Sequence, residues 1–259
     1  MIDIHCHILP NVDDGSKDLQ ESIEMAKIAE SEGIKKIVNT SHYHPSFEYE
    51  KGEVIIDKLN SFNKLLKDQN INIEVIVGNE LYYTVDLLET LNDLDFYTIN
   101  NGRYLLIEFP PTQFPQNLCD IIYEIKLKGY IPILAHVERY VEVQDNPNLI
   151  FECIKEGAII QINASSILAK KGSKIEKICD ILLSNNMVHV VGTDAHSCKR
   201  RRPFMKESYN YVVSKYGRGM GDNLFSKNSS LIIDDKEIIK FEPKRYVEKR
   251  SFFSKIFKK

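Results

Sequence analysis

The sequence predicts a distorted (β/α)7 barrel of the TIM-like kind in residues 1–240, followed by a basic tail in residues 241–259. Two observations lead to this fold class. Short apolar segments alternate with helical patterns along the chain, which is typical of parallel strands joined by right-handed crossovers. Histidine or acidic residues directly follow six of the seven apolar segments. A closed barrel brings six strand ends to one place more readily than an open sheet does.

Seven segments are predicted as strands because each is a short run rich in Ile, Val or Leu that ends at polar or turn residues. They cover residues 1–4, 34–40, 73–79, 104–107, 130–135, 158–162 and 188–193.

Between the strands, apolar residues recur at helical spacing, as at Ile55, Leu59 and Phe62. Start and stop signals mark the helix ends. Asp18 resembles the N-cap of the first helix, and Gly33 resembles its C-terminal cap. The helices are predicted at residues 18–33, 53–69, 85–91, 115–129, 147–157, 174–186 and 203–216.

The composition is ordinary for a globular chain, with 43% apolar and 27% charged residues. No apolar run is long enough for a membrane span, and Asp3, His5 and His7 interrupt the N-terminus where a signal peptide needs an apolar core. The five cysteines are scattered and include no CxxC pair, which favours a reducing compartment. We therefore expect a cytoplasmic protein.

The net charge of −3 conceals an asymmetry. Residues 241–259 carry seven Lys or Arg and two Glu, so the barrel domain has a net charge of −8. Such acidity argues against a nucleic-acid binder. Residues 249–259 form a basic, amphipathic segment able to make a weak contact with an anionic leaflet at the inner membrane face, although a solvated terminus explains the pattern equally well. Its apolar residues are Phe252, Phe253, Ile256 and Phe257.

Metal-ligating residue types gather at the predicted strand ends. His5 and His7 close the first strand, and residues two apart in a strand point the same way, so both imidazoles can bind one ion. Unrelated surface polar groups would explain any one of these residues, but six strand ends together favour a shared site. His44 and His189 are set aside as a pocket-lining and a packed residue. The candidate metal ligands are His5, His7, Asp14, His42, Glu80, Glu108, His136, Asp194 and His196.

The four carboxylates in this set need a counter-charge. Two like charges about 4 Å apart repel by roughly 4 kcal/mol at an effective dielectric of about 20, and bound cations remove that cost. Nine ligands are too many for one ion, so two or three divalent ions are expected, with Glu80 or Asp194 bridging. Imidazole with carboxylate suits zinc, manganese or iron. Three such ions would leave a positive local charge that suits a phosphate monoester dianion.

Two arginines adjoin the predicted site. Arg139 lies shortly after the fifth strand, and Arg201 is the middle one of three consecutive arginines after the seventh strand. Guanidinium groups suit phosphate oxygens, so both are expected to bind phosphate, with a solvated loop as the alternative. Spacing alone leaves open whether Arg200, Arg201 or Arg202 makes the second contact.

Together these motifs are similar to those of the polymerase and histidinol phosphatase (PHP) superfamily. Within it, the chain resembles the metal-dependent tyrosine-protein phosphatases of bacterial capsule and exopolysaccharide operons, over roughly residues 1–240. The resemblance implies a trinuclear, usually manganese-dependent site, with iron, cobalt, zinc or magnesium as other ions. The motifs are His5-x-His7, Asp13-Asp14-Gly15, Ser41-His42-Tyr43-His44, Gly78-Asn-Glu80, Ile107-Glu108-Phe109, Ala135-His136-Val-Glu-Arg139 and Gly192-Thr-Asp194-Ala-His196.

The resemblance also implies how the ligands are shared and what the site acts on. Arg139 and Arg201 match the family's phosphate-binding arginines. The implied substrate is the phosphotyrosine tail of a membrane-associated kinase that controls capsule synthesis. Three ions would divide the ligands as His5, His7, Glu80 and Asp194; Glu80, Glu108 and His136; and Asp14, His42 and His196.

Metal-assisted hydrolysis is the expected chemistry, because no cysteine has an arginine six residues on, as cysteine-dependent tyrosine phosphatases require. Three alternatives remain: a small-molecule phosphomonoesterase of the histidinol-phosphatase type, a phosphodiesterase or exonuclease, and a metal-binding scaffold without turnover. The acidic body argues against the second, and the complete ligand set argues against the third.

Overall fold

The computed structural model describes residues 1–44, 46–91, 95–110 and 114–248. Seven parallel strands form one sheet in which each strand pairs with its neighbour in chain order. This topology confirms the predicted barrel class. The strands are β1 (Ile2–Cys6), β2 (Lys36–Tyr43), β3 (Glu74–Tyr82), β4 (Tyr104–Glu108), β5 (Ile131–Leu134), β6 (Ile159–Asn163) and β7 (Val190–Gly192).

The barrel closes where the end of β1 meets the residues that follow β7. The Asp194 N–H donates to the His5 carbonyl over 2.7 Å, and the His7 N–H donates to the Ala195 carbonyl over 2.8 Å. The closing hydrogen bonds therefore involve the backbone of three candidate metal ligands.

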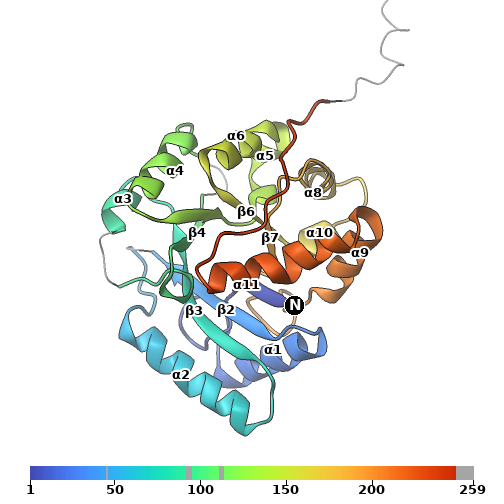
Figure 1. Ribbon diagram of the computed structural model, residues 1–259. Coiled ribbons are helices and arrows are strands. Elements are labelled where there is room, and N and C mark those ends of the chain that lie inside the picture. The colour runs from blue at the N-terminus through green and yellow to red at the C-terminus, as the bar shows by residue number, and fades with distance from the viewer. Residues whose placement is uncertain (45, 92–94, 111–113, 249–259) are drawn as a thin grey trace, which may run out of the picture.

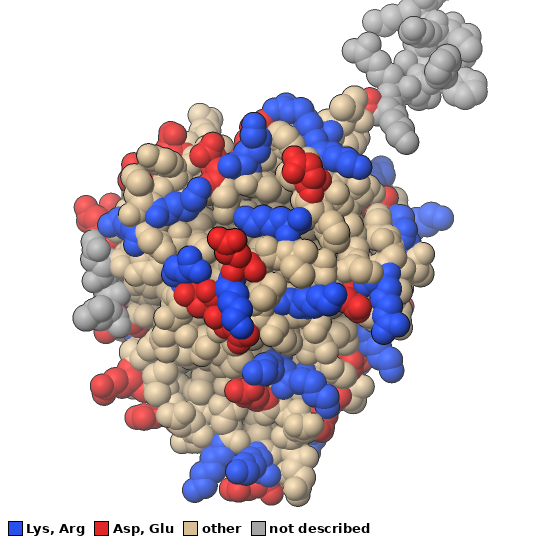
Figure 2. Space-filling view, viewed as in Figure 1, with Lys and Arg blue, Asp and Glu red and all other residues tan. Residues whose placement is uncertain are grey.

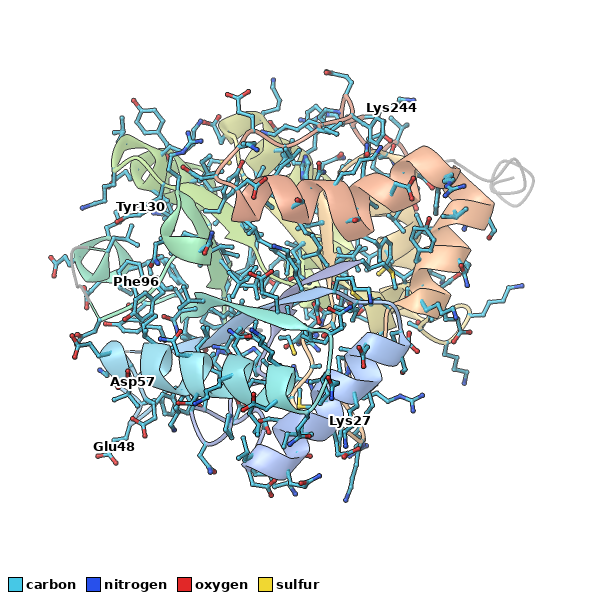
Figure 3. The ribbon with its side chains drawn as sticks, turned by 60° about the horizontal axis from the view of Figure 1, so that its bottom comes forward. Lys27, Glu48, Asp57, Phe96, Tyr130 and Lys244 are labelled. Carbon is cyan, nitrogen blue, oxygen red and sulfur yellow. The ribbon has the colours of Figure 1, made fainter. Side chains whose placement is uncertain are left out.

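Helices cover the outside of the barrel between the strands (Figure 1). On α2 the predicted face is confirmed, because Ile55, Leu59, Phe62 and Leu66 are buried, whereas Figure 3 shows Asp57 on the outer side. The longer helices are α1 (Leu19–Ser31), α2 (Glu53–Asp68), α4 (Leu118–Leu127), α6 (Asn148–Glu156), α8 (Lys174–Ser184) and α9 (Lys206–Tyr216). Shorter helical segments are α3 (Leu87–Thr90), η1 (Ile99–Asn101), η2 (Val137–Arg139), α5 (Val141–Asp145), α7 (Ala164–Ile167), α10 (Arg218–Asp222), η3 (Asn223–Lys227) and α11 (Asn228–Ile233).

Five strands, β1, β2, β3, β4 and β6, end later in the chain than the sequence predicts, and the differences are largest in β2 and β3. β2 continues to Tyr43 and β3 to Tyr82, because residues 41–43 pair in register with residues 79–81. The expectation that candidate ligands follow their strands is therefore wrong for His5 in β1 and Glu108 in β4, and it is also wrong for His42 and Glu80. Both lie within the sheet, directly opposite each other.

Apolar side chains fill the barrel, and α11 closes one end of it. Ile232 and Ile233 of α11 pack with interior strand residues such as Ile4, Val38 and Leu106. Figure 1 shows α11 crossing in front of the strands, beside the N-terminus. The sequence does not predict this helix, because the segment before it is rich in Gly, Asn and Ser, which have low helix propensity. Burial of the two isoleucines stabilises it instead.

The last described residues run back over the outside of the barrel. The Lys244 N–H donates to the Asn185 carbonyl over 2.8 Å, and the Tyr246 N–H donates to the Asn148 side chain over 2.8 Å. Figure 2 shows acidic and basic side chains interspersed on the face around α11. The predicted amphipathic segment at residues 249–259 lies outside the described residues. Among the residues that are described, no helix combines the length and apolar character needed to cross a membrane.

His189 is buried in the barrel wall, as the sequence predicts. Its Nδ1 accepts a hydrogen bond from the Ile160 N–H over 3.1 Å. Burial, reinforced by the charge of Lys240, lowers the pKa of His189 to about 3. The folded protein therefore keeps this ring neutral at pH values where an unfolded chain, with a histidine pKa of about 6.5, takes up a proton.

We expect the substitution His189→Asn to reduce the loss in free energy of unfolding that the protein shows as the pH falls below about 6.5. Because the pKa of His189 is lower in the folded state than in the unfolded state, the stability that depends on this group is fully present above about pH 6.5. It falls as the pH decreases towards about 3, by at most about 1.4 kcal/mol per pH unit from this group. Asparagine keeps an acceptor for the Ile160 N–H and does not titrate. Urea unfolding of both proteins from about pH 7.5 to 4.5 measures the difference, and parallel profiles would contradict the prediction.

Candidate metal centre

All nine candidate ligands lie at one mouth of the barrel, linked to one another by short side-chain contacts. Most of them are buried, His42 and Glu108 are half-buried, and Asp14 is exposed at the outer edge. The structure thus brings together every ligand that the sequence proposes. The remaining histidine near the mouth, His44, lines a neighbouring recess.

One group joins β1 to β3 and to the residues after β7. His5 Nε2 lies 3.1 Å from Glu80 Oε2 and 3.6 Å from Asp194 Oδ1. His7 Nε2 lies 3.2 Å and 3.8 Å from the same two oxygens. Ligand atoms bound about 2.1 Å from one ion are roughly 3 to 4 Å apart, so this group has the dimensions of a coordination shell.

Glu80 faces a second group with its other oxygen. Glu80 Oε1 lies 3.1 Å from His136 Nε2, which lies 3.3 Å from Glu108 Oε1. A carboxylate with one oxygen in each group has the geometry of a bridging ligand between two ions. Asp194 directs only Oδ1 towards the imidazoles. The geometry therefore favours Glu80 over Asp194 as the bridge.

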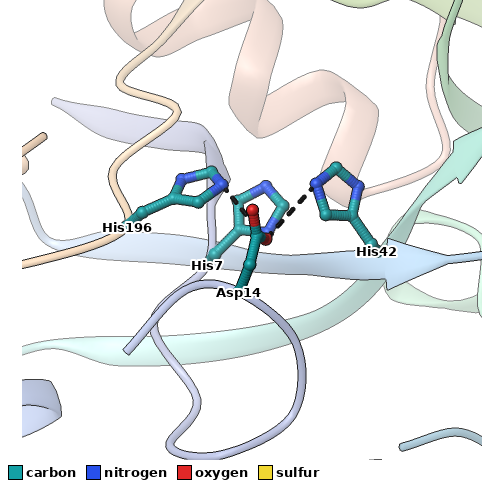
Figure 4. A group of neighbouring side chains, drawn as sticks. All are labelled: His7, Asp14, His42 and His196. Atoms are coloured by element: carbon teal, nitrogen blue, oxygen red, sulfur yellow. Dashed lines mark ion pairs between the residues drawn. The ribbon is translucent and has the colours of Figure 1, made fainter. Parts of the chain in front are cut away.

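A third group surrounds Asp14 (Figure 4). Asp14 Oδ1 lies 3.6 Å from Nε2 of His42 and 3.6 Å from Nε2 of His196. His7 also lies within ligand distance of these three residues, whereas the family pattern assigns it to the first ion alone. His42 Nδ1 is 3.3 Å from Glu80 Oε2, so the three groups are contiguous.

Two candidates depend on left-handed backbone geometry. His136 has φ 33° and ψ 52°, and Asp194 has φ 54°. Such conformations cost of the order of 1–3 kcal/mol in non-glycine residues and are concentrated at functional sites. Ile133 of β5 and Ala135 directly after β5 face the barrel interior, so regular alternation would turn His136 outward. The left-handed turn brings its ring to the mouth instead.

An irregularity in β1 has a similar effect. Its register against β2 shifts between Asp3 and Cys6. Ile4 packs in the barrel interior, and His5 next to it still faces the mouth. Gly192 on β7 permits this arrangement, because a Cβ there would lie only 2.6 Å from the Cβ of His5.

Acceptors behind the imidazoles fix their orientation. His7 Nδ1 donates to Asp13 Oδ2 over 2.6 Å, and His196 Nδ1 donates to the Asp194 carbonyl over 3.0 Å. Each ring then presents its Nε2 lone pair to the cluster, which is the form that binds a metal. Asp13 also accepts the His42 N–H over 2.8 Å, so it is a positioning residue for two candidates.

Gln161 is a positioning residue that sequence reasoning missed. Its Oε1 lies 3.2 Å from His5 Nδ1 and accepts the His136 N–H over 2.7 Å. Its Nε2 donates to Asn163, whose own amide donates to Asp194 Oδ2 over 2.9 Å. This buried chain of amides connects three candidates. The available signal is the pair of amides at alternate positions of an otherwise apolar strand.

Charge on the imidazoles balances the buried carboxylates. Burial alone would raise the pKa of Glu80, but His5 and neighbouring histidines hold that pKa well below its ordinary value. Burial alone would lower the pKa of His136, but hydrogen bonds to Glu108 and Glu80 raise it to about 10. A divalent cation would compete with that proton, since ligand histidines bind metals in the neutral form. The donor set therefore fits divalent cations.

Both predicted phosphate-binding arginines reach the cluster. Arg139 Nη1 lies 2.7 Å from Asp194 Oδ2, and Arg201 Nη2 lies 2.6 Å from Asp194 Oδ1. Their side chains are 39% and 42% exposed, so the guanidinium groups stand at the opening of the site. Arg202 lies instead over the ring of Phe204.

Two cavities adjoin the cluster. The larger has a volume of about 730 Å³ and is lined by polar and charged residues, among them Lys17, Arg200 and Arg201. The smaller has a volume of about 210 Å³ and adjoins His42 and Glu108. The cluster is therefore accessible to a ligand from the surface.

This fold and this site define a βα-barrel protein of the metal-dependent enzyme class. A family model described as "Capsular polysaccharide synthesis, CpsB/CapC" matches residues 1–234. The chain belongs to that family, which confirms the resemblance found in the sequence.

Relatives of this chain cover nearly its whole length. The tyrosine-protein phosphatase YwqE of Bacillus subtilis (strain 168) is 32% identical over 253 residues, which are 98% of this chain and 99% of YwqE. The tyrosine-protein phosphatase CpsB of Streptococcus agalactiae serotype III (strain NEM316) is 33% identical over 244 residues, which are 92% of this chain and 100% of CpsB.

Solved structures share the fold. One comes from a study of crystal structures of YwqE from Bacillus subtilis and CpsB from Streptococcus pneumoniae, which are described as unique metal-dependent tyrosine phosphatases. It matches this chain with a TM-score of 0.90 and 31% sequence identity, and the match covers 96% of this chain and 100% of that chain. A histidinol phosphate phosphatase from Lactococcus lactis subsp. lactis matches in fold, with a TM-score of 0.57 and 15% identity over 83% of this chain and 93% of that chain.

We expect Asp13→Asn to weaken divalent-cation binding by about 10- to 100-fold, because loss of the acceptor charge behind a ligand histidine typically has this effect. Binding is measured by titrating manganese into the chelator-treated protein. Glu24→Gln, the same change on an exposed carboxylate of α1, is the matched control. Equal affinities for Asp13→Asn and the unmodified chain, with unchanged melting temperatures, would contradict the role of Asp13.

Proposed function

We propose that the protein is a manganese-dependent protein-tyrosine phosphatase that hydrolyses phosphotyrosine with a metal-activated water. The observation that carries the proposal is the placement of Glu80 between two groups of ligands, with Arg139 and Arg201 at the opening. The relatives named above, about one third identical over nearly their full length, are named tyrosine-protein phosphatases and support the same reaction.

The residues of the chain would divide the work as follows. His5, His7, Asp194 and the other candidates would hold the cations, and Glu80 would offer one carboxylate oxygen to each of two ligand groups. When bound, the cations lower the pKa of a shared water towards about 7 and supply positive charge at the phosphoryl group. Arg139 and Arg201 bind non-bridging phosphate oxygens through their guanidinium forks. They thereby orient the ester and offset the negative charge that develops on it.

Manganese is the proposed ion because the site mixes imidazole nitrogens with carboxylate oxygens and contains no cysteine ligand among the nine candidates. The four carboxylates suit manganese, whereas the five imidazoles also suit zinc and iron, so iron, cobalt, zinc and magnesium are the competing ions. Metal analysis of protein purified without chelator distinguishes among them.

The proposed substrate is the phosphotyrosine tail of a membrane-associated tyrosine kinase of the capsule pathway. The family description and the names of the relatives support this assignment. Cavities on two sides of the cluster open it to the surface, as a protein substrate requires. We place the protein in the cytoplasm, at the inner membrane face where such a kinase presents its tail. Contact of residues 249–259 with anionic lipid is part of this proposal.

We expect Glu80→Gln and His136→Ala to lower kcat/KM on a phosphotyrosine peptide by more than about 100-fold. Replacing a ligand should exceed the roughly 10- to 100-fold loss that follows from changing a residue behind a ligand. His189→Asn, a change at a buried histidine outside the cluster, is the matched control. Near-normal turnover by either variant with manganese would contradict the mechanism. Faster turnover of histidinol phosphate or single-stranded DNA than of the peptide by the unmodified chain would contradict the substrate class.

We expect a chelator to abolish turnover and added manganese to restore it. The ligands are pre-oriented by Asp13 and Gln161, so the fold should survive metal removal and the loss should be reversible. Initial rates after dialysis against chelator, then after separate addition of manganese, zinc, iron, cobalt or magnesium, measure the effect. Full activity in the metal-depleted protein would refute metal dependence, and a higher rate with zinc would refute the choice of manganese.

A further inference from the structure

A small aromatic recess opens beside the cluster, with a volume of about 210 Å³. It is smaller than the roughly 300–1,000 Å³ of pockets that hold drug-sized ligands, so its size suits a single ring rather than a folded metabolite. Its lining residues are His42, His44, Phe47, Tyr49, Tyr82 and Glu108.

The rings of the recess contact one another and form a continuous wall. Tyr49 stacks with His42 at a centroid separation of 6.0 Å and with Phe47 at 5.4 Å. His44 lies 4.4 Å from the Phe47 ring and 4.9 Å from the Tyr82 ring. Phe47 is 54% exposed, so a large part of an apolar ring faces solvent at the edge of the recess. Such a wall offers faces and edges to another aromatic ring.

The recess is continuous with the candidate metal centre, because His42 and Glu108 belong to both. On the cluster side, His42 Nε2 lies 3.6 Å from Asp14 and Glu108 Oε1 lies 3.3 Å from His136. In an aryl phosphate, the ring is joined to phosphorus through one oxygen. The ring of a phosphoryl ester held by the cluster is therefore close enough to reach the recess. The side chain of phosphoserine has no ring to fill it.

We propose that this recess binds the phenyl ring of phosphotyrosine and makes the site selective for aryl over alkyl phosphate monoesters. The inference rests on the proposed phosphatase function. Phe47 and Tyr82 are the specificity-determining residues, since neither is a candidate metal ligand and both line the recess. Another apolar crevice, between α4 and α6, shares no residue with the cluster and is not a subsite for the same ring.

The test measures ring recognition separately from turnover. Calorimetry on the full chain loaded with manganese gives Kd for phenylphosphonate and for methylphosphonate, which share the charged group and differ in the ring. The unmodified chain should bind phenylphosphonate more tightly. Phe47→Ala and Tyr82→Leu should each weaken phenylphosphonate binding by roughly 3- to 10-fold, as loss of an aromatic contact predicts, and leave methylphosphonate binding unchanged. Tyr123→Leu, at an exposed tyrosine of α4 away from the recess, is the matched control.

Turnover of phosphotyrosine and phosphoserine peptides of the same sequence completes the experiment. The preference for phosphotyrosine should fall in Phe47→Ala and Tyr82→Leu but not in Tyr123→Leu. Equal binding of the two phosphonates by the unmodified chain, or equal weakening of both by the variants, overturns the recess proposal while leaving the phosphatase proposal intact. Ring-selective binding without turnover of either peptide supports the recess as an aryl subsite and refutes the phosphatase function.

Discussion

Repulsion among carboxylates confined to one barrel mouth is the constraint on which the rest of the site depends. Glu80 and Asp194 are almost completely buried, so water cannot solvate their charges. The protein surrounds them with imidazoles and places two guanidinium groups at the opening. The Nδ1 atoms of His7 and His5 are directed away from Glu80 and Asp194, towards Asp13 and Gln161 respectively. When a divalent cation displaces the protons that the carboxylates stabilise on these rings, imidazole lone pairs and carboxylate oxygens converge on it, as metal binding requires.

The same crowding explains why the barrel is irregular at its mouth. β7 must approach β1 closely enough for Asp194, just after β7, to meet His5 of β1. Only glycine at position 192 leaves room for the Cβ of His5. Asp3, buried below the cluster, accepts hydrogen bonds from the Thr193 N–H at 2.9 Å and the Thr193 hydroxyl at 2.5 Å. This contact ties β1 to the residues after β7 through two side chains that are not candidate ligands. The barrel floor, by contrast, is regular and apolar, and α11 seals it.

The barrel and the meeting of the nine candidate ligands could be predicted from the sequence, because most of these residues lie at or just after the end of an apolar run and parallel strands end at the same edge. The role of Gln161 could not, since the two amides of the apolar β6 strand mark a polar position but do not show that His5 lies beside it. The inward turn of His136 depends on a left-handed residue that sequence spacing does not reveal. Nor does the pattern predict the recess, because Phe47 and Tyr82 come from different segments and meet only where the loop after β2 folds onto the end of β3.

The two cavities suggest how a phosphate ester would be oriented. In-line displacement at phosphorus requires the attacking water and the leaving oxygen on opposite sides of the phosphoryl group. The aromatic recess adjoins His42 and Glu108, whereas the polar cavity adjoins Asp14, His196 and Arg201. An ester whose ring occupies the recess therefore leaves the polar cavity for water and for departing phosphate. The peptide that carries the ring would leave past Phe47 to the surface, so the charged cavity would contact phosphate and solvent rather than the peptide chain.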